Sequence, residues 1–147
     1  WTSDWYNLES WERVNGKDYY YNAQLRRYGG DLQGIINKLD YLQELGITAI
    51  YLNPVFESPS AHKYGATFYH HIDNNLGPNP QKDIQIWSQE VHDDPKTWQW
   101  TTADNLFLNL IKEVHDRDMK IIIDGVFNHC GIPFFALEDV KKSISSS

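Results

Sequence analysis

Apolar residues recur at helical spacing in the segment that begins at residue 32. The positions on this face are Leu32, Ile35, Ile36, Leu39, Leu42 and Leu45. Asp31 stands where an N-cap should be, because its carboxylate can accept hydrogen bonds from the free N–H groups of the first turn. Gly46 follows where a helix should end, because glycine readily adopts left-handed backbone angles. The pattern predicts one amphipathic helix over residues 32–45.

A strand pattern follows this helix directly. The run "ITAIYL", residues 47–52, is apolar at successive positions and ends at Asn53 and Pro54. A half-buried strand would alternate apolar and polar residues, whereas a strand with two apolar faces is typical of a parallel sheet that helices cover on both sides. We therefore predict a buried parallel strand over residues 47–52.

The same order of elements returns later in the chain. The second apolar helix face consists of Leu106, Phe107, Leu110, Ile111 and Val114. We expect Asp104 to be its N-cap, and "KIIIDGVF", residues 120–127, to form a second buried strand. The order helix, strand, helix, strand indicates the α/β class, and we expect the two strands to be parallel neighbours.

The connection between the two units is unusually long. It runs from Asn53 to Ala103, whereas such loops usually contain about 2 to 6 residues, and long ones are more often functional. It leaves the C-terminal end of its strand, where parallel α/β proteins bind ligands. We expect Trp98 and Trp100 to pack this loop against the sheet, a glucan-binding platform being the alternative. His70–His71 carries a weaker metal-site hypothesis, since neighbouring side chains of a strand point to opposite sides.

Composition and charge narrow the classes of partner. The chain has 147 residues, 41% hydrophobic and 22% charged, which suits one globular unit over residues 1–147. The net charge of −7 argues against nucleic acid or an anionic membrane, because both bind clustered Lys and Arg. No apolar run in the sequence approaches membrane-spanning length. A single cysteine, Cys130, excludes an intrachain disulfide and leaves the compartment open.

Three polar residues close the second strand pattern, in the stretch "IIIDGVFNH". Read alone, Asp124 is a strand-end residue that caps a loop, and Asn128 and His129 are turn residues bonded to the backbone. Each of these interpretations is structural. The spacing of the three residues changes that view when it is read together with the segments upstream.

Three segments together resemble the α-amylase superfamily, glycoside hydrolase family 13. They are "RYGGDLQGIINKLDYLQELGITAIYLNPVFES", "HKYGATFYHHID" and "DGVFNH". The family's signature of Asp, any residue, Val, any residue, Asn, His is matched by Asp124, Val126, Asn128 and His129. "HHIDNNLGPNP" and "DPKTWQWTTAD" are similar to bacterial cyclomaltodextrinase and neopullulanase-like members. The resemblance extends from about residue 5 to 140 and implies a partial TIM (β/α)8 barrel, with two helix–strand units and a long βα loop.

The resemblance also implies roles for individual residues. His129 would hydrogen-bond a hydroxyl of the sugar next to the scissile bond, and Tyr64 would stack under that ring. Asp124 would orient neighbouring residues of the site. Asn128 matches the position that ligates a structural calcium in many members, an ion that several cyclomaltodextrinase-like members lack. No other cofactor is expected, and the implied substrate is an α-glucan oligosaccharide or a cyclodextrin.

Departures from the family pattern limit what the chain does alone. Two acidic positions of the family's loop are Gly65 and Phe68 here. Retaining glycosidases need two carboxyl groups about 5 to 5.5 Å apart, and the acids after His129 are Glu138 and Asp139, which lack the family's catalytic context. We expect the chain to be a fragment of the catalytic barrel without its first strand, inactive alone, with the nucleophilic Asp and the acid/base Glu downstream of Ser147.

Two functional classes follow from these observations. The first is part of an α-glucan hydrolase that cleaves α-1,4 or α-1,6 bonds with retention, or a transglycosylase of the same kind. The second is a noncatalytic carbohydrate-binding protein or transporter-associated subunit that kept the barrel and lost its carboxylates. A downstream strand with Arg, any residue, Asp, followed by a later Glu, would favour the first class.

Overall fold

A computed structural model describes residues 30–137 of the chain. The chain divides into two compact units, Trp1–Gly30 and Asp31–Ser147, and all the elements below belong to the second. The prediction of one domain over residues 1–147 depends on residues outside the described range and stays a prediction. Glu138 and Asp139 also lie outside the described residues.

The first predicted helix is present but divided. It forms α2, Leu32–Ile36, and α3, Leu39–Glu44. The Asp31 carboxylate accepts a hydrogen bond from the Gly34 N–H at 2.8 Å, and Gly46 has a φ of +84°, so both predicted end signals are confirmed. The prediction of a single helix was wrong, because Asn37 ends α2 as its C-cap. This role suits the low helix propensity of asparagine.

The two predicted strands are parallel neighbours, as the sequence indicated. β1 spans Ala49–Leu52 and β2 spans Lys120–Ile123, with Ile50 beside Ile121 and Tyr51 beside Ile122. Both strands are shorter than the predicted ranges 47–52 and 120–127. The Asp124 N–H still donates to the Leu52 carbonyl at 3.1 Å. Pairing then stops because β1 is followed by Pro54, which has no N–H to donate.

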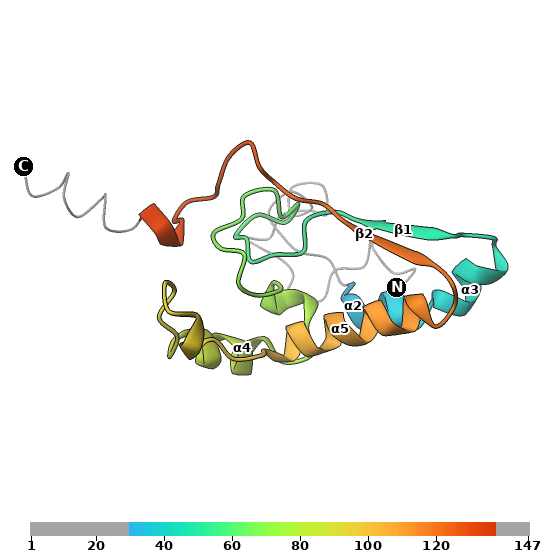
Figure 1. Ribbon diagram of the computed structural model, residues 1–147, viewed down its shortest axis with the longest axis horizontal. Coiled ribbons are helices and arrows are strands. Elements are labelled where there is room, and N and C mark those ends of the chain that lie inside the picture. Colours follow the sequence, from blue (N-terminus) through green and yellow to red (C-terminus); the bar gives the residue numbers. More distant parts are fainter. Residues whose placement is uncertain (1–29, 138–147) are drawn as a thin grey trace, which may run out of the picture. The chain divides into compact units, whose positions relative to one another are not determined.

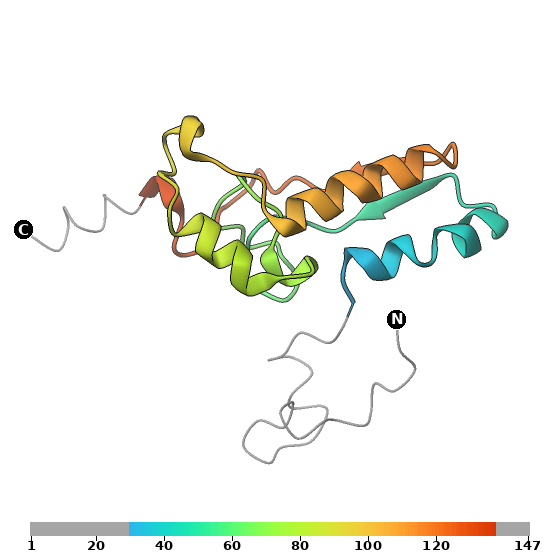
Figure 2. The same ribbon diagram turned by 90° about the horizontal axis from the view of Figure 1, so that it is seen from below.

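Helices cover one face of this sheet, as Figures 1 and 2 show from two directions. Ile50 and Ile121 point to that face and pack against the core. The buried core residues are Leu32, Leu39, Leu52, Val55, Ile72, Ala103, Phe107, Leu110, Val114 and Met119. The core therefore lies between the sheet and two helices, α2 and α5, Thr102–His115.

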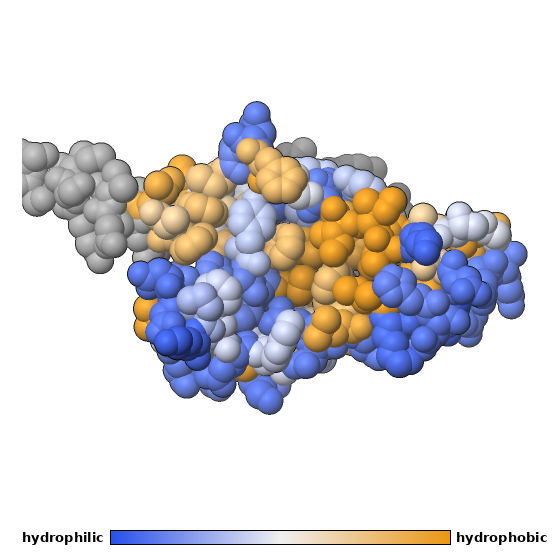
Figure 3. Space-filling model, viewed as in Figure 1, coloured by the Kyte–Doolittle hydropathy of each residue, from blue (hydrophilic) through white to orange (hydrophobic). Residues whose placement is uncertain are grey.

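The other face of the sheet was predicted to be buried and is not covered by the described residues. Tyr51 and Ile122 are neighbours on it and remain 58% and 48% exposed. Figure 3 shows the apolar surface that gathers over β2 and α5. The sequence correctly indicated that both faces are apolar. Successive residues of a strand point to opposite faces of the sheet. The described helices cover only the side of Ile50 and Ile121.

The long connection contains short helices of its own. It forms η2, Asn74–Leu76, then α4, Pro80–Trp87, then η3, Pro95–Thr97, and η4, Phe135–Leu137, follows β2. Within residues 30–137, none of the helices has both the length and the apolar character needed to cross a bilayer. The connection is therefore a structured insertion beside the C-terminal ends of the strands.

The helix α5, Thr102–His115, begins differently from the prediction. Its N-cap is Thr101, and Asp104 is the third residue of the first turn. The Thr101 Oγ1 accepts from the Asp104 N–H at 3.0 Å, and the Asp104 carboxylate accepts from the Thr101 N–H at 2.9 Å. This is a capping box, in which the two residues satisfy each other's backbone donors. Asp83 adds further acceptors for the N–H groups of Thr102 and Ala103.

Candidate sugar-binding site

The candidate site lies where the two parallel strands end. Residues 53–73 leave β1, and residues 124–131 leave β2, at the same edge of the sheet. The first of these segments returns on itself, because Phe56 pairs with Ile72 in an antiparallel bridge. The Asp73 N–H closes it by donating to the Val55 carbonyl at 2.8 Å. The segment between them carries Tyr64.

Tyr64 and Asp124 meet across this edge. The Tyr64 Oη donates a hydrogen bond to Asp124 Oδ2 at 2.8 Å, although 60 residues separate them in the sequence. Two residues that the family resemblance placed in one site therefore touch. The hydrogen bond fixes the tyrosine hydroxyl at an edge where both residues are half-buried.

Tyr51 is a residue of this edge that the sequence reading missed. It comes from β1, and its hydroxyl interacts with Asp124 as Tyr64 does. The hydrogen bond to Asp124, burial and the carboxylate charge raise the pKa of Tyr51 and of Tyr64 above the ordinary tyrosine value. Both phenols are therefore neutral hydrogen-bond donors at neutral pH. Tyr51 stands one residue before the end of β1, and this position was a signal available in the sequence.

A buried ion pair holds the loop before Tyr64. Lys63 adopts a φ of +65°, and its Nζ donates to the Asp73 carboxylate and to the Ser58 carbonyl. Burial would raise the pKa of Asp73, but the hydrogen bonds from Lys63 and Asn75 and the lysine charge hold that pKa below its ordinary value. Lys63 turns inward in a left-handed conformation, and Tyr64 beside it turns toward Asp124.

The loop is also clamped to the segment after β2. The Tyr69 Oη donates to the Val126 carbonyl at 2.7 Å, and the Gly131 N–H donates to the Ala66 carbonyl at 2.7 Å. A Cβ on Gly131 would lie 2.1 Å from the Gly65 carbonyl oxygen, so only glycine allows this approach. The clamp fixes the ends of the segment that carries Asn128 and His129.

His129 and Asn128 lie at the exposed end of this segment. His129 Nδ1 is 3.3 Å from Asn128 Oδ1, and both residues are exposed. The structure thus pairs Tyr64 with Asp124, while the imidazole of His129 contacts its neighbour in the chain. Its proposed sugar contact stays a prediction.

Asn128 is the residue that the family resemblance assigns to calcium. Within residues 30–137 no group of three or more His, Cys, Asp or Glu side chains is arranged to hold a metal, and calcium also uses amide and backbone carbonyl oxygens. The Asn128 amide oxygen lies 3.3 Å from His129 Nδ1. Calcium ligation by Asn128 stays a prediction.

The residues of the weaker metal hypothesis each have other partners. His70 Nε2 lies 2.9 Å from the His92 carbonyl, and His71 lies between two carboxylates. His71 and Asp73 were not recognised from the sequence as parts of a buried polar network. Their charged partners Lys63, Glu90 and Asp104 lie 10, 19 and 33 residues away, a separation that leaves no local pattern.

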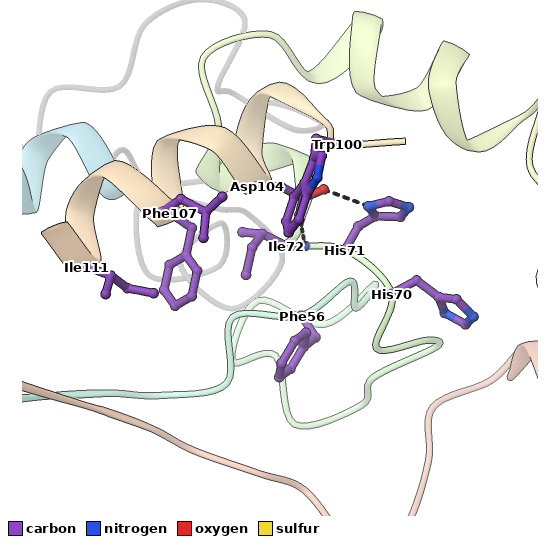
Figure 4. Close-up of a pocket in the computed structure, with 9 residues that line it drawn as sticks. Phe56, His70, His71, Ile72, Trp100, Asp104, Phe107 and Ile111 are labelled. Carbon is purple, nitrogen blue, oxygen red and sulfur yellow. Dashed lines mark hydrogen bonds and ion pairs between the residues drawn. The ribbon is translucent and has the colours of Figure 1, made fainter. Parts of the chain in front are cut away.

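A hollow lies beside the buried polar network of His71, between the long connection and α5. It has a volume of about 220 Å³ and is drawn in Figure 4. Its lining is mainly apolar, with Phe56, Ile72, Trp100, Phe107, Leu108 and Ile111 beside His70, His71 and Asp104. Trp98 packs on His70 of the same connection, with ring centroids 4.1 Å apart, so its packing against the sheet stays a prediction. Trp100 is 69% exposed, which contradicts the packing prediction for that residue.

Comparison with known proteins decides the family. The α-amylase catalytic domain matches residues 8–96 and 97–147, which is nearly the whole chain. The chain belongs to the α-amylase family. This confirms the resemblance that the segments "HKYGATFYHHID" and "DGVFNH" indicated.

Two curated relatives show which branch the chain is similar to. A cyclomaltodextrinase of Thermoanaerobacter pseudethanolicus is 43% identical over 116 residues, covering 79% of this chain and 16% of the relative. Neopullulanase 2 of Thermoactinomyces vulgaris is 42% identical over 115 residues, covering 78% and 15%. The chain therefore spans about a sixth of the length of these relatives.

Solved structures agree with this assignment. The cyclic α-maltosyl-(1→6)-maltose hydrolase of Arthrobacter globiformis is 34% identical, with a TM-score of 0.59, over 82% of this chain and 22% of that one. The type III pullulan hydrolase of Thermococcus kodakarensis is 37% identical, with a TM-score of 0.56, over 77% and 15%. The fold of the described residues is thus similar to one part of these larger proteins.

Proposed function

We propose that this chain forms the sugar-binding rim of an α-glucan-acting glycoside hydrolase. The complete enzyme would cleave α-1,4 or α-1,6 glucosidic bonds in starch-derived oligosaccharides or cyclodextrins, with retention of configuration. The chain would supply two helix–strand units of a (β/α)8 barrel. The observation that carries the proposal is the hydrogen bond from Tyr64 to Asp124, which joins the loop residue and the strand-end residue of the family's site at 2.8 Å.

The geometry suits the recognition of a neutral sugar. A tyrosine ring offers an apolar face to the apolar face of a glucosyl unit, and Asp124 holds the Tyr64 hydroxyl so that the ring keeps one orientation. His129 lies after β2 on the segment that Tyr69 and Gly131 hold against the loop. A group on a segment that is held at both ends can be positioned closely enough to favour a transition state.

The relatives support the substrate class. Their names describe a cyclomaltodextrinase, a neopullulanase and a pullulan hydrolase, and one related structure is a complex with cyclic α-maltosyl-(1→6)-maltose. All these names refer to α-linked glucans or their cyclic forms. We extend this substrate class to the complete protein to which the chain would belong.

The catalytic carboxylates would come from other parts of the complete enzyme. Retaining hydrolysis needs a nucleophile and an acid/base about 5 to 5.5 Å apart. We assign Asp124 the role of orienting Tyr64, because its carboxylate already accepts the tyrosine hydroxyl. The purified 147-residue chain should therefore release no reducing sugar from maltooligosaccharides or cyclodextrins. Activity that is lost on changing Glu138 or Asp139 would contradict this assignment.

A noncatalytic carbohydrate-binding protein or transporter-associated subunit is the second candidate. The replacement of two acidic loop positions by Gly65 and Phe68 favours it, because those carboxylates make contacts in the family. Hydrolysis assays on the complete protein separate the two candidates. Turnover with retained configuration, lowered by Tyr64→Ala, supports the hydrolase. Binding of maltooligosaccharides without turnover supports the second candidate.

A further inference from the structure

A buried histidine joins three segments of the structure. His71 Nδ1 lies 2.7 Å from Asp104 Oδ2, and His71 Nε2 lies 2.7 Å from Glu90 Oε2. The side chains of His71, Asp104 and Glu90 are 4%, 6% and 3% exposed. The Trp87 ring stacks on the imidazole, with centroids 6.0 Å apart. The contact to Asp104 is drawn in Figure 4.

The geometry fits a positively charged imidazole. An ionised carboxylate only accepts hydrogen bonds, so each ring nitrogen of His71 must carry a proton to donate. Asp104 is ionised, because it also accepts from the N–H groups of Ile72 and Thr101. Burial would raise the pKa of Asp104, but the hydrogen bonds from His71, Ile72 and Thr101 lower it below its ordinary value.

The two carboxylates also determine how His71 titrates. Burial would lower the pKa of His71, but the hydrogen bonds and charges of Asp104 and Glu90 raise it above its ordinary value. Asp104 comes from α5, and Glu90 comes from the segment after α4. From the loop itself, His70 is the neighbouring titratable group, and its pKa is lowered by burial and by the charges of His92 and His71. The Phe68 and Trp87 rings complete the surroundings without charge.

The two carboxylates differ in how firmly they are held. Asp104 keeps its contacts to Ile72 and Thr101 without His71. Glu90 keeps the Gln99 N–H, which donates to Glu90 Oε1 at 2.7 Å. Glu90 therefore closes residues 90–99 into a loop, and His71 attaches that loop to the N-terminus of α5. If His71 lost a proton, its bare ring nitrogen would face a carboxylate oxygen, and both atoms are acceptors. Glu90 is the partner that can move away.

We propose that His71 is a pH-dependent latch for residues 88–100. As an imidazolium it fastens this segment, through Glu90, to the N-terminus of α5, and its deprotonation releases Glu90. The latch acts on the sugar site through a short chain of contacts, because Asp104 binds the Ile72 N–H and the next residue, Asp73, holds Lys63 beside Tyr64. This last step rests on the function proposed above for Tyr64.

The direction of the pH effect follows from the raised pKa of His71. The folded protein holds the His71 proton more tightly than the unfolded chain, whose histidine pKa is about 6.5. The stabilising contribution is complete below that value and is lost as pH rises through the folded pKa. The latch is therefore closed below about pH 6.5 and opens as the pH rises through the raised pKa of His71.

Histidine-ring NMR on the purified protein tests the proposal. The ring signals of His71, assigned by their loss in His71→Gln, should show both nitrogens protonated at the acidic end of the titration and a midpoint above about 6.5. The amide of Gln99 should shift, and its exchange rate, corrected for the intrinsic pH dependence, should rise with the same midpoint. Glu90→Gln should lower the His71 midpoint, and His115→Gln, on the exposed end of α5, should leave it unchanged.

Two outcomes would overturn the latch. One is a His71 pKa at or below that of free histidine, and the other is a Gln99 amide that does not respond while His71 titrates. Glu90→Gln provides the test if His71→Gln does not fold. None of these measurements needs a sugar, so a protein that shows the transition and binds no maltooligosaccharide would contradict the proposed function alone.

Discussion

Asp124 and Asp104 are two carboxylates in different settings. Asp124 lies at the half-exposed edge after β2 and accepts a hydrogen bond from Tyr64. Asp104 lies in the first turn of α5, is 5% exposed, and accepts from His71, Ile72 and Thr101. A partly solvated carboxylate can exchange partners with a ligand at little cost, whereas a buried one with all its donors in place holds the fold.

The largest effect should separate these two carboxylates. Asp104→Ala should lower the free energy of unfolding by about 3 to 5 kcal/mol, because it removes one of the two carboxylates around the buried His71 and the acceptor of the Ile72 and Thr101 N–H groups. Asp124→Ala should lower it by about 1 kcal/mol, the net value of one hydrogen bond. Urea denaturation of the two variants measures the difference. Equal losses would show that both residues have the same structural role.

The second test concerns the edge near Asp124, in the complete protein. His129→Ala should lower kcat and kcat/KM by roughly 10- to 1000-fold, if a hydrogen bond to the sugar strengthens in the transition state. Tyr64→Ala should mainly raise KM, since stacking also acts in the ground state. His115→Ala, on α5, is the matched control. Unchanged kcat and kcat/KM for His129→Ala would show that His129 is a loop residue without a role in sugar binding or catalysis.

The clamp between the loop and the segment after β2 gives a third test. Gly131→Ala should destabilise the protein by about 1 to 3 kcal/mol, the usual cost of forcing extra volume into a packed site. The added Cβ would lie 2.1 Å from the backbone oxygen of Gly65. Gly65→Ala is the control, because its Cβ would meet its nearest atom, Ser60 Oγ, at 3.6 Å. Equal melting temperatures of the two variants in thermal unfolding would show that the clamp accommodates the added Cβ without loss of stability.

The smallest effect should come from removing one hydroxyl. Tyr64→Phe keeps the ring and loses the hydrogen bond to Asp124, so KM for a maltooligosaccharide should rise roughly 2- to 10-fold. Tyr51→Phe removes the other hydroxyl that interacts with Asp124 and should have a smaller effect, because Tyr51 lies on the strand outside the loop. Steady-state kinetics on both variants ranks them. A larger effect for Tyr51→Phe would move the centre of the site to β1.

Local patterns predicted much of the fold. Helical spacing located the apolar faces of α2, α3 and α5, and the apolar run "ITAIYL" located β1. Asp31 and Gly46 marked the ends of the first helical segment, since capping depends on residues within one turn. The motif "DGVFNH" indicated the candidate site through its resemblance to the family's signature.

Contacts between distant residues could not be predicted in this way. His71 meets Glu90 and Asp104 across 19 and 33 residues, and Tyr64 meets Asp124 across 60. The capping box was missed although Thr101 and Asp104 have the required spacing, because an acidic residue before an apolar run also resembles an N-cap. The break at Asn37 was missed because one residue of low propensity does not outweigh a continuous apolar face.

The amino-acid sequence therefore determined the order of the two helix–strand units and the family, because these depend on spacing along the chain. Tertiary packing determined which face of the sheet the helices cover and which tyrosines interact with Asp124. It also placed two carboxylates around His71, which favour its protonated form. The physical reason is that burial and hydrogen-bond partners set the charge of a side chain. Those partners come together only when β1, α5 and the long connection pack against one another.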